Sequence, residues 1–469
     1  MDDLNVLVII SDTLRRDHLG AYGSDVRTPH LDRFAQSAVV FDQHIIGSFP
    51  TMPARADYLT GLLSLTFMGW EPLGTDLRTL PAMLKEAGYT SVGIVDTPFY
   101  VRDGWGYDRG FDDFFWIRGQ GEDTRPLERS DSRSIWLGES DRFAAQTMRE
   151  ASDWLERNHR EKFFLYVDTW DPHEPWDAPD YYTSLYLPDY AGEELFPAYR
   201  KVSEAGLSER ELELGRALYR GEVTMVDRWV GFLLDKLRVL GIEDRTVVFF
   251  LSDHGFYFGE HDYFGKADWF DPGTATQLAE GSEAPAWLTE SWLFTLLRSP
   301  LYQELTRVPL LVRMPGVEPR RTSALTTAID LPATILDIAG VDGGDLHGRS
   351  FKDVVVSKRA EHREFVISSW PLYFARGEYT SAVDGKRRAI STYMPITVTT
   401  AQRSLLIGGP DDPVELYDLG ADPGEQNNVW SDREPQDEQL FDDALSYLAD
   451  LGTDEGALTA RRRAIAAGT

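Results

Sequence analysis

The stretch T-V-V-F-F-L-S-D-H-G, residues 246–255, joins an apolar run to two chemically versatile side chains. Asp253 and His254 stand two and three positions after the last apolar residue, Leu251. A strand that is apolar on both faces is typical of a parallel sheet with helices on both sides. Ligands of such sheets bind beyond the carboxyl ends of the strands. The stretch therefore predicts an α/β fold with a functional site where this strand ends.

Two other apolar runs end in the same manner. Residues 5–10, N-V-L-V-I-I, lead into Ser11-Asp12-Thr13, and residues 162–167, K-F-F-L-Y-V, lead into Asp168, with Asp171 and His173 close behind. Residues 308–312 form a fourth strand-like run, and residues 225–240 carry apolar side chains at helical spacing. Strands that alternate with helices predict a large, mostly parallel sheet between helices.

The C-terminal part has a different character, with short, turn-rich segments from about residue 359. Residues 365–368, 379–383, 388–391 and 403–407 predict a small antiparallel sheet. Residues 440–451 predict a helix, and residues 458–469 form a basic, Ala-rich end. We therefore expect a catalytic α/β domain over 1–358, a small α+β subdomain over 359–435 and a helical tail over 436–469.

The composition argues against several classes of partner. The chain has 469 residues, no cysteine and a net charge of −30, which disfavours nucleic acid and anionic membranes. A small anionic substrate stays compatible, because a site can be locally positive inside an acidic surface. We find no signal-peptide pattern and no apolar run long enough to span a bilayer, so a cytoplasmic protein is expected. The tail from about Asp432 is a candidate for subunit contacts in a homo-oligomer.

Asp12, Asp253 and His254 are the candidate metal ligands, because each follows a predicted buried strand and the strand ends can converge. Carboxylates bind hard divalent cations, and an added histidine favours Zn²⁺ or Mn²⁺. Taken singly, Asp12 could instead cap the helical segment that follows it, and Asp253-His254 could cap a strand end. Thr51, in T-M-P-A-R (51–55), offers a hydroxyl two residues from Pro53 and four from Arg55.

These motifs in this order resemble the sulfatase family of the alkaline phosphatase superfamily. The matching stretches are S-D-T-L-R-R-D-H-L-G (11–20), T-P-H-L-D-R-F-A (28–35), T-M-P-A-R-A-D-Y-L-T-G (51–61), G-F-D-D-F (110–114), D-T-W-D-P-H-E-P-W (168–176), S-D-H-G (252–255), G-E-H (259–261), G-K (265–266), R-V-P-L-L-V-R-M-P-G (307–316), L-H-G-R-S-F (346–351) and E-L-Y-D-L-G-A-D-P-G-E-Q-N-N (415–428). The resemblance implies an alkaline-phosphatase-like fold and one catalytic divalent metal.

The resemblance also implies roles for individual residues. Asp12, Asp253 and His254 would bind the metal together with Thr51, which stands at the position of the family nucleophile. Arg55 would hold that nucleophile and a substrate oxygen. His173 and Lys266 would contact the transferred anion or protonate the leaving oxygen.

The sequence departs from the family pattern in three places. Family sulfatases have Cys or Ser at the Thr51 position, oxidised to formylglycine, whereas oxidation of Thr would give a ketone. The usual pair of acids is here Asp12-Thr13, which favours Zn²⁺ or Mn²⁺ over Ca²⁺ or Mg²⁺, with Thr13 as a weak additional contact. The stretch G-I-V-D-T-P-F-Y (93–100) lacks the usual lysine. A second metal, using Asp171, His173 or the distant His347, is the less favoured alternative.

Residues 267–300 form an insertion before the R-V-P motif, with aromatic residues that include Trp287 and Trp292. It is either a surface hairpin or a lid over the site. The leading hypothesis is a metal-dependent hydrolase of phosphate mono- or diesters or phosphonate monoesters that acts through a Thr51 ester on a small-molecule anionic substrate. The alternatives are a sulfatase that uses Thr51 directly, an inactive anion-binding homologue and a transferase.

Overall fold

The computed structural model describes residues 4–101, 104–117, 136–197, 199–269, 297–357, 359–372, 394–409 and 412–467. Its centre is an eight-stranded sheet in the order β13-β2-β12-β7-β1-β5-β3-β4. The strands are β1 (Asn5–Ser11), β2 (Val39–Ile45), β3 (Thr90–Val95), β4 (Asp113–Trp116), β5 (Phe163–Thr169), β7 (Thr246–Ser252), β12 (Arg307–Arg313) and β13 (Arg320–Thr327). Neighbouring strands run parallel except around β12, which is antiparallel to both β2 and β7. The expected mostly parallel sheet is confirmed.

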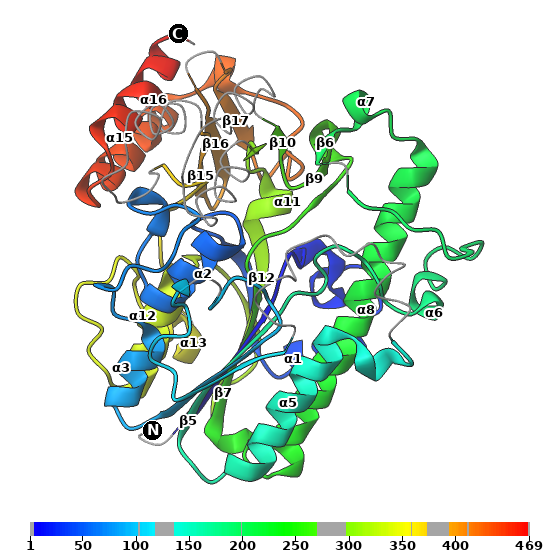
Figure 1. Cartoon of the computed structure of the whole chain (residues 1–469). Coiled ribbons are helices and arrows are strands. Elements are labelled where there is room, and N and C mark those ends of the chain that lie inside the picture. Colours follow the sequence, from blue (N-terminus) through cyan, green and yellow to red (C-terminus); the bar gives the residue numbers. More distant parts are fainter. Residues whose placement is uncertain are drawn as a thin grey trace.

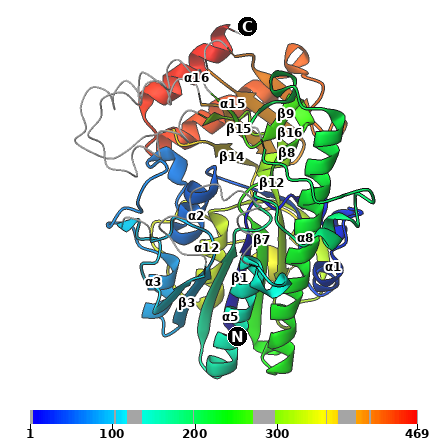
Figure 2. The ribbon, with the colours of Figure 1, turned by 45° about the vertical axis from the view of Figure 1, so that its right-hand side comes forward.

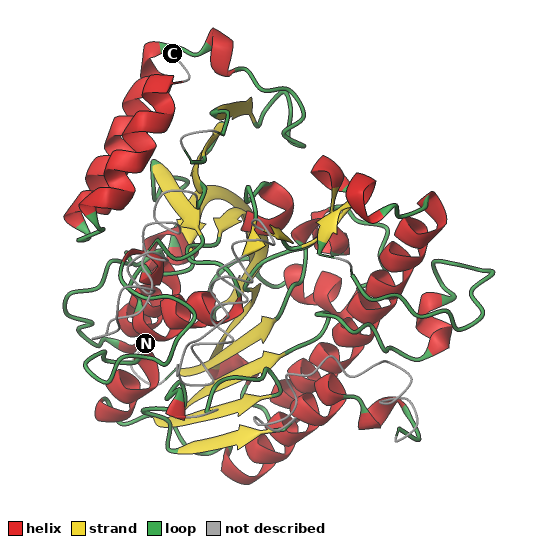
Figure 3. Ribbon diagram, turned by 45° about the horizontal axis from the view of Figure 1, so that its top comes forward, coloured by secondary structure: helices red, strands yellow, loops and turns green. Residues whose placement is uncertain are grey.

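Helices cover both faces of this sheet, as Figures 1 and 3 show. One face carries α1 (Pro29–Ala35), α5 (Phe143–Asn158) and α8 (Glu209–Val239), and the other carries α2 (Thr51–Thr60), α3 (Leu80–Glu86), α12 (Asp330–Ala339) and α13 (Lys352–Val356). Side chains alternate between the faces: Leu7 and Ile9 of β1 pack with the first set of helices, and Val8 packs with the second. This double burial explains why the strands read as continuous apolar runs.

Helix α8 is longer than the apolar pattern at 225–240 indicated. It starts at Glu209, where the Ser208 side chain accepts a hydrogen bond from the Glu211 backbone N–H and Glu211 returns the contact. This reciprocal capping box satisfies amide groups that the first turn leaves without partners. The helix ends before Gly241, which adopts φ 66°. The structure thus extends the predicted helix by about four turns toward its N-terminus.

A second, four-stranded antiparallel sheet lies beside the main sheet, at the carboxyl ends of β1, β5 and β7 (Figures 1 and 2). We call it the C-terminal sheet; it comprises β14 (Phe365–Ser369), β15 (Ile396–Thr400), β16 (Arg403–Ile407) and β17 (Glu415–Asp418). The first and third of these match predicted strands, whereas the predicted strands at 379–383 and 388–391 lie outside the described residues. Helices α15 (Pro435–Asp450) and α16 (Glu455–Ala467) follow, so the predicted helix begins five residues earlier than expected.

The C-terminal sheet shares a buried cluster with the segments around the strand ends. Phe49, Tyr257 and Leu301 belong to the same apolar cluster as Val398 and Leu405 of the C-terminal sheet. The remaining short elements are β6 (Arg200–Lys201), β8 (Tyr257–Phe258), β9 (Tyr263–Gly265), the antiparallel pair β10 (Asp268–Trp269) and β11 (Leu297–Arg298), and helices α6 (Asp180–Thr183), α7 (Val202–Ala205) and α11 (Gln303–Thr306).

The predicted insertion at 267–300 is described only at its two ends, where β10 pairs with β11. Its aromatic residues Trp287 and Trp292 lie outside the described residues, so its role as a lid stays a prediction. None of the described helices is both long and apolar enough to cross a membrane. The division at residue 358 also stays a prediction.

Candidate active site

Strand register brings the predicted metal ligands together. Strand β1 lies between β5 and β7, and Ser11 at its end is paired with Thr169 on one side and Ser252 on the other. The three strands therefore end at one level, and the chain continues there into Asp12, Trp170 and Asp253. This placement confirms that three carboxyl ends of the sheet meet at one edge.

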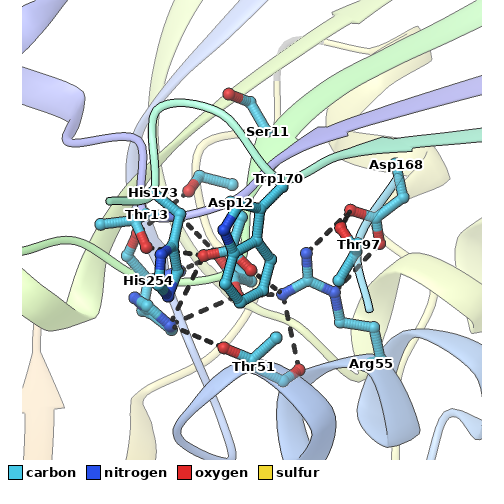
Figure 4. A network of polar contacts seen from close by, with 12 residues as sticks. Ser11, Asp12, Thr13, Thr51, Arg55, Thr97, Asp168, Trp170, His173 and His254 are labelled. Carbon is cyan, nitrogen blue, oxygen red and sulfur yellow. Dashed lines mark hydrogen bonds and ion pairs between the residues drawn. The ribbon is translucent and has the colours of Figure 1, made fainter. Parts of the chain in front are cut away.

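Asp12, Asp253 and His254 offer ligand atoms that all lie within 4.8 Å of one another, and all three residues are buried (Figure 4). Thr13 holds both carboxylates: its backbone N–H donates to Asp253 Oδ1 at 2.9 Å, and its hydroxyl donates to Asp12 Oδ1 at 2.6 Å. Thr13 adopts φ 62°, a conformation that aims this N–H at Asp253. Thr13 therefore contacts the two carboxylates of the cluster through hydrogen bonds and holds them in position.

His254 is arranged as a neutral nitrogen ligand. Its Nδ1 lies 3.0 Å from the Gly255 carbonyl oxygen, which accepts the ring N–H and leaves the Nε2 lone pair free to bind a cation. Burial, reinforced by the charge of Lys266, lowers the pKa of His254 to about 3. Nε2 lies 3.4 Å from Asp253 Oδ2 and 3.4 Å from Thr51 Oγ1. The imidazole is therefore uncharged at neutral pH, and its Nε2 faces Asp253 and Thr51.

The charges of the cluster fit a divalent cation. Burial and the neighbouring Asp253 raise the pKa of Asp12 to about 6, although Arg55 and Lys266 act against this shift. Asp12 Oδ2 lies 3.0 Å from Arg55 Nη1 but receives no aligned hydrogen bond from the described residues. Two carboxylates and one imidazole are a donor set suited to Zn²⁺ or Mn²⁺.

Thr51 is the first residue of α2, and only 3 % of its surface is exposed. The helix N-terminus directs its partial positive charge at the cluster, where an anion would bind. Figure 4 shows the Thr51 hydroxyl facing the ring of His254, beside the guanidinium of Arg55. The structure therefore places the predicted nucleophile next to the predicted metal ligands.

Arg55, one turn along α2, is enclosed by carboxylates. Its Nε and Nη2 donate to the two oxygens of Asp168 at 3.0 and 2.8 Å, a bidentate pair. Its Nη1 pairs with Asp12 and with Asp253. Arg55 therefore balances the buried negative charge around the cluster, in addition to standing near Thr51.

Asp168 is the residue of this network to which sequence reasoning gave no role. It accepts hydrogen bonds from the hydroxyls of Thr97, at 2.8 Å, and of Tyr100. Both donors come from the stretch 93–100, the one that lacks the family lysine. That departure was the available signal, but the sequence could not show that Thr97 and Tyr100 support the partner of Arg55.

His173 and Lys266 reach the site from two loops. The His173 ring stacks on Trp170, with centroids 3.6 Å apart, and its Nδ1 lies 2.6 Å from the Glu174 carbonyl oxygen. Lys266 directly follows β9 and is 5 % exposed; its charge lowers the pKa of both Asp12 and Glu174, although burial raises each of them more. Glu174, which sequence reasoning also passed over, is buried and hydrogen-bonded by Tyr199.

The residues considered for a second metal do not join the cluster. Among the described residues, neither Asp171 nor His173 belongs to a group of three potential ligands within 4.8 Å. The Asp171 carbonyl accepts a hydrogen bond from Ser11 Oγ at 2.7 Å, which ties the two strand ends together. His347 Nδ1 accepts the Leu63 N–H at 3.0 Å, beyond the end of α2. These contacts are structural.

Comparison with known proteins shows the family to which the chain belongs. The family model described as Sulfatase matches residues 4–341. The chain belongs to the sulfatase family. A second family model, described as N-sulphoglucosamine sulphohydrolase, C-terminal, matches residues 297–448. As a sulfatase-family member the chain is a hydrolase, as expected. Enzymes of this family bind a divalent metal, and the Asp12, Asp253 and His254 cluster is the candidate site for it.

The relatives of this sulfatase-family chain carry several activities in their names. An N-acetylglucosamine-6-O-sulfatase of Bacteroides thetaiotaomicron is 24% identical, over 96% of this chain and 88% of the relative. The multifunctional alkaline phosphatase superfamily protein PehA of Trinickia caryophylli is 27% identical, over 56% of this chain and 65% of its own length. A solved structure of the phosphonate monoester hydrolase of Agrobacterium radiobacter has a TM-score of 0.72 at 21% identity and covers 96% of both chains, which shows the shared fold.

Proposed function

We propose that this chain hydrolyses phosphate mono- or diesters or phosphonate monoesters through a covalent ester on Thr51. The observation that carries the proposal is the position of Thr51 Oγ1, 3.4 Å from His254 Nε2 at the N-terminus of α2. A hydroxyl at this position lies next to a candidate metal site and at the N-terminus of a helix. Both features favour attack on an anionic ester.

The methyl group of Thr51 decides between the chemistries of the family. A formylglycine needs a primary alcohol or thiol, and its second hydroxyl releases the sulfated intermediate by elimination. Thr51 cannot become an aldehyde, so its ester must be opened by water. This favours phosphoryl or phosphonyl transfer, in which water attacks phosphorus in a second step.

Each residue of the site has its own role in the proposed reaction. The Thr51 hydroxyl loses its proton to solvent, and its oxygen bonds to phosphorus while the bond to the leaving oxygen breaks. His173 or Lys266 gives the leaving oxygen a proton. Water then attacks phosphorus, the Thr51–phosphorus bond breaks, and Thr51 regains its proton. A divalent cation held by Asp12, Asp253 and His254 would lower the pKa of the Thr51 hydroxyl and offset the charge of the ester.

Arg55 has a supporting part in this scheme. Its guanidinium is fixed from one side by Asp168, so its Nη1 stays directed at the cluster and at the backbone of Thr51. A planar guanidinium matches the oxygens of a tetrahedral anion. Arg55 would therefore bind a non-bridging oxygen of the ester once a cation has taken over the two cluster carboxylates.

The second candidate function is hydrolysis of sulfate esters by Thr51 directly. The family match and the relatives named as sulfatases favour it. The phosphonate monoester hydrolase fold and the PehA relative favour phosphorus esters instead. The substrate in either case is a small anionic ester, and Mn²⁺ or Zn²⁺ is the preferred metal, with Ca²⁺ or Mg²⁺ as alternatives.

A substrate panel tests the proposal. We would measure kcat/KM with added Mn²⁺ or Zn²⁺ on p-nitrophenyl phosphate, bis-p-nitrophenyl phosphate, p-nitrophenyl phenylphosphonate and p-nitrophenyl sulfate. Thr51→Val keeps the shape of the side chain and removes the nucleophile, so a loss of about 10³-fold or more is expected. Thr60→Val is the matched control, since Thr60 is a buried residue of the same helix whose hydroxyl bonds to the Ala56 carbonyl.

The outcomes separate the candidates. Turnover of phosphorus esters that disappears with Thr51→Val and survives Thr60→Val supports the proposal, as does a phosphoryl group on the Thr51 peptide after acid quenching. Turnover of the sulfate ester alone moves the assignment to the second candidate. Full activity of Thr51→Val on every ester removes Thr51 from the mechanism.

A further inference from the structure

A second group of metal-ligating side chains lies outside the candidate active site. Ligand atoms of His261, Glu304 and Glu425 all lie within 4.8 Å of one another. They come from three separate segments: the turn between β8 and β9, helix α11, and the loop that follows β17. The fold therefore assembles this group from positions up to 164 residues apart in the chain (261 to 425).

The polar atoms of this group are buried and lack hydrogen-bond partners. His261 Nε2, Glu304 Oε2 and Glu425 Oε1 have no partner among the described residues, and Glu425 is only 1 % exposed. Buried polar atoms in folded proteins almost always have a partner, because an orphaned one loses the hydration it had in water. Three such atoms at one place indicate that something absent from the polypeptide satisfies them.

The neighbouring contacts hold the three side chains in place and leave these atoms directed at one another. The His261 ring stacks on Tyr302, with centroids 3.7 Å apart and 13° between the planes. The Gln303 backbone N–H donates to Glu425 Oε2 at 2.6 Å, which leaves Oε1 of that carboxylate turned inward. Supporting contacts of this kind orient the ligands of metal sites.

Protons alone do not satisfy the group. His261 Nε2 and Glu304 Oε2 are 3.4 Å apart, longer than an imidazole–carboxylate hydrogen bond. The Ser404 hydroxyl is close to the Glu425 carboxylate, but its oxygen also has no aligned hydrogen bond among the described residues. A proton shared by the histidine and one glutamate would still leave an oxygen of the other without a partner.

We propose that His261, Glu304 and Glu425 form a second divalent-cation site, distinct from the Asp12, Asp253 and His254 cluster. One imidazole nitrogen and two carboxylates are the donor set of Zn²⁺ or Mn²⁺, and water would complete the coordination. A cation of charge +2 would balance the two carboxylates, and its size fills a space bounded by three ligand atoms a few ångströms apart.

The position of the proposed site indicates a structural role, because the site lies between two separate parts of the fold. Glu425 follows the C-terminal sheet, whereas Glu304 lies against the turn that carries His254: the Gly255 N–H donates to the Leu305 carbonyl at 2.9 Å. The approach is so close that a Cβ at Gly255 would lie 1.9 Å from the Glu304 carbonyl oxygen. The cation would thus fasten the C-terminal sheet to the turn that carries His254.

Metal counting in a variant with a disabled active site tests the proposal. Asp253→Asn protein, loaded with Zn²⁺ or Mn²⁺ and freed of excess metal, is expected to retain about one ion per chain, against about two for the wild type. Adding Glu425→Gln should reduce this at least about tenfold. Glu415→Gln is the matched control, because Glu415 accepts hydrogen bonds from Tyr302 and Tyr417 beside the group without belonging to it; it should keep the ion.

Two results would overturn the second site: Asp253→Asn protein that retains no metal, or a Glu425→Gln combination that retains as much as Asp253→Asn alone. If Glu425→Gln does not fold, His261→Asn and Glu304→Gln in the same background make the same test. Anomalous diffraction from Zn²⁺-loaded crystals supplies an independent measurement. It should place an ion about 2.0–2.1 Å from His261 Nε2.

Discussion

Replacement of Asp168 by asparagine tests how the site positions Arg55. Asp168 is fully buried and holds the guanidinium through two hydrogen bonds, of 2.8 and 3.0 Å. Asparagine has nearly the same shape, but it removes the charge and offers a single acceptor oxygen. The substitution therefore changes the electrostatics around Arg55 with little change in packing.

The expected magnitude follows from the contacts. A buried ion pair that loses one partner typically costs about 3–5 kcal/mol of folding free energy. Arg55 keeps Asp12 and Asp253 as partners, so we expect the lower end, about 3 kcal/mol. Because the guanidinium would then be held mainly through Nη1, it can rotate about that contact and lose its orientation toward the substrate oxygens. We therefore expect kcat to fall about 10–100-fold, as for other residues that orient a site indirectly.

The assay compares kcat and KM on the best substrate of the panel, together with urea unfolding. Thr97→Val is the matched control: it removes one hydrogen bond to Asp168 and leaves the bidentate pair intact. Its kcat should stay within about threefold of the wild type, with a stability loss of about 1–2 kcal/mol. The positioning role is refuted if Asp168→Asn keeps the wild-type kcat, or if Thr97→Val lowers kcat equally.

Three further predictions concern acid stability, the leaving group and the core. Burial would raise the pKa of Asp330, but Arg363 and His362 outweigh it and hold that pKa well below 3.8; the stability it contributes is complete above about pH 4 and is lost as pH falls. Urea midpoints should therefore drop more steeply below pH 4 for the wild type than for Asp330→Asn, and equal slopes would contradict this. Lys266→Met should slow esters with poor leaving groups more than p-nitrophenyl esters, in parallel kcat/KM measurements, if Lys266 protonates the leaving oxygen. Leu405→Ala, at a fully buried position of the C-terminal sheet, should cost about 2–5 kcal/mol in urea unfolding, with metal content unchanged.

Local sequence patterns predicted the strands that carry the site. Strands β1, β5 and β7 are buried on both faces, and their apolar runs are visible without any knowledge of the fold. Strand β2 escaped prediction because Asp42, Gln43 and His44 interrupt its apolar run. Its His44 is fully buried and hydrogen-bonded to Thr326 of β13, a partner 282 residues away. This pairing and the pairing with β12 place a partly polar segment inside the sheet.

The contacts that define the site cross the whole chain. The Thr13 N–H reaches Asp253 across 240 residues, and Arg55 reaches Asp168 across 113. Such contacts have no local signature, because they depend on which strands become neighbours and at what register. The sequence therefore identified Asp12, Thr51, Asp253 and His254 as candidates, but not the part of Asp168 in holding Arg55.

The sequence by itself determined the α/β class, the sulfatase family and the threonine at the nucleophile position, since each depends on residue type and order along the chain. Tertiary structure alone decided that β12 runs antiparallel, that Thr97 and Tyr100 stand behind Asp168, and that His261, Glu304 and Glu425 meet. The physical reason is the distance along the sequence over which each kind of signal acts. Hydrophobic periodicity and short motifs act within a few residues, whereas burial, charge balance and unpartnered polar atoms exist only after distant segments have packed together.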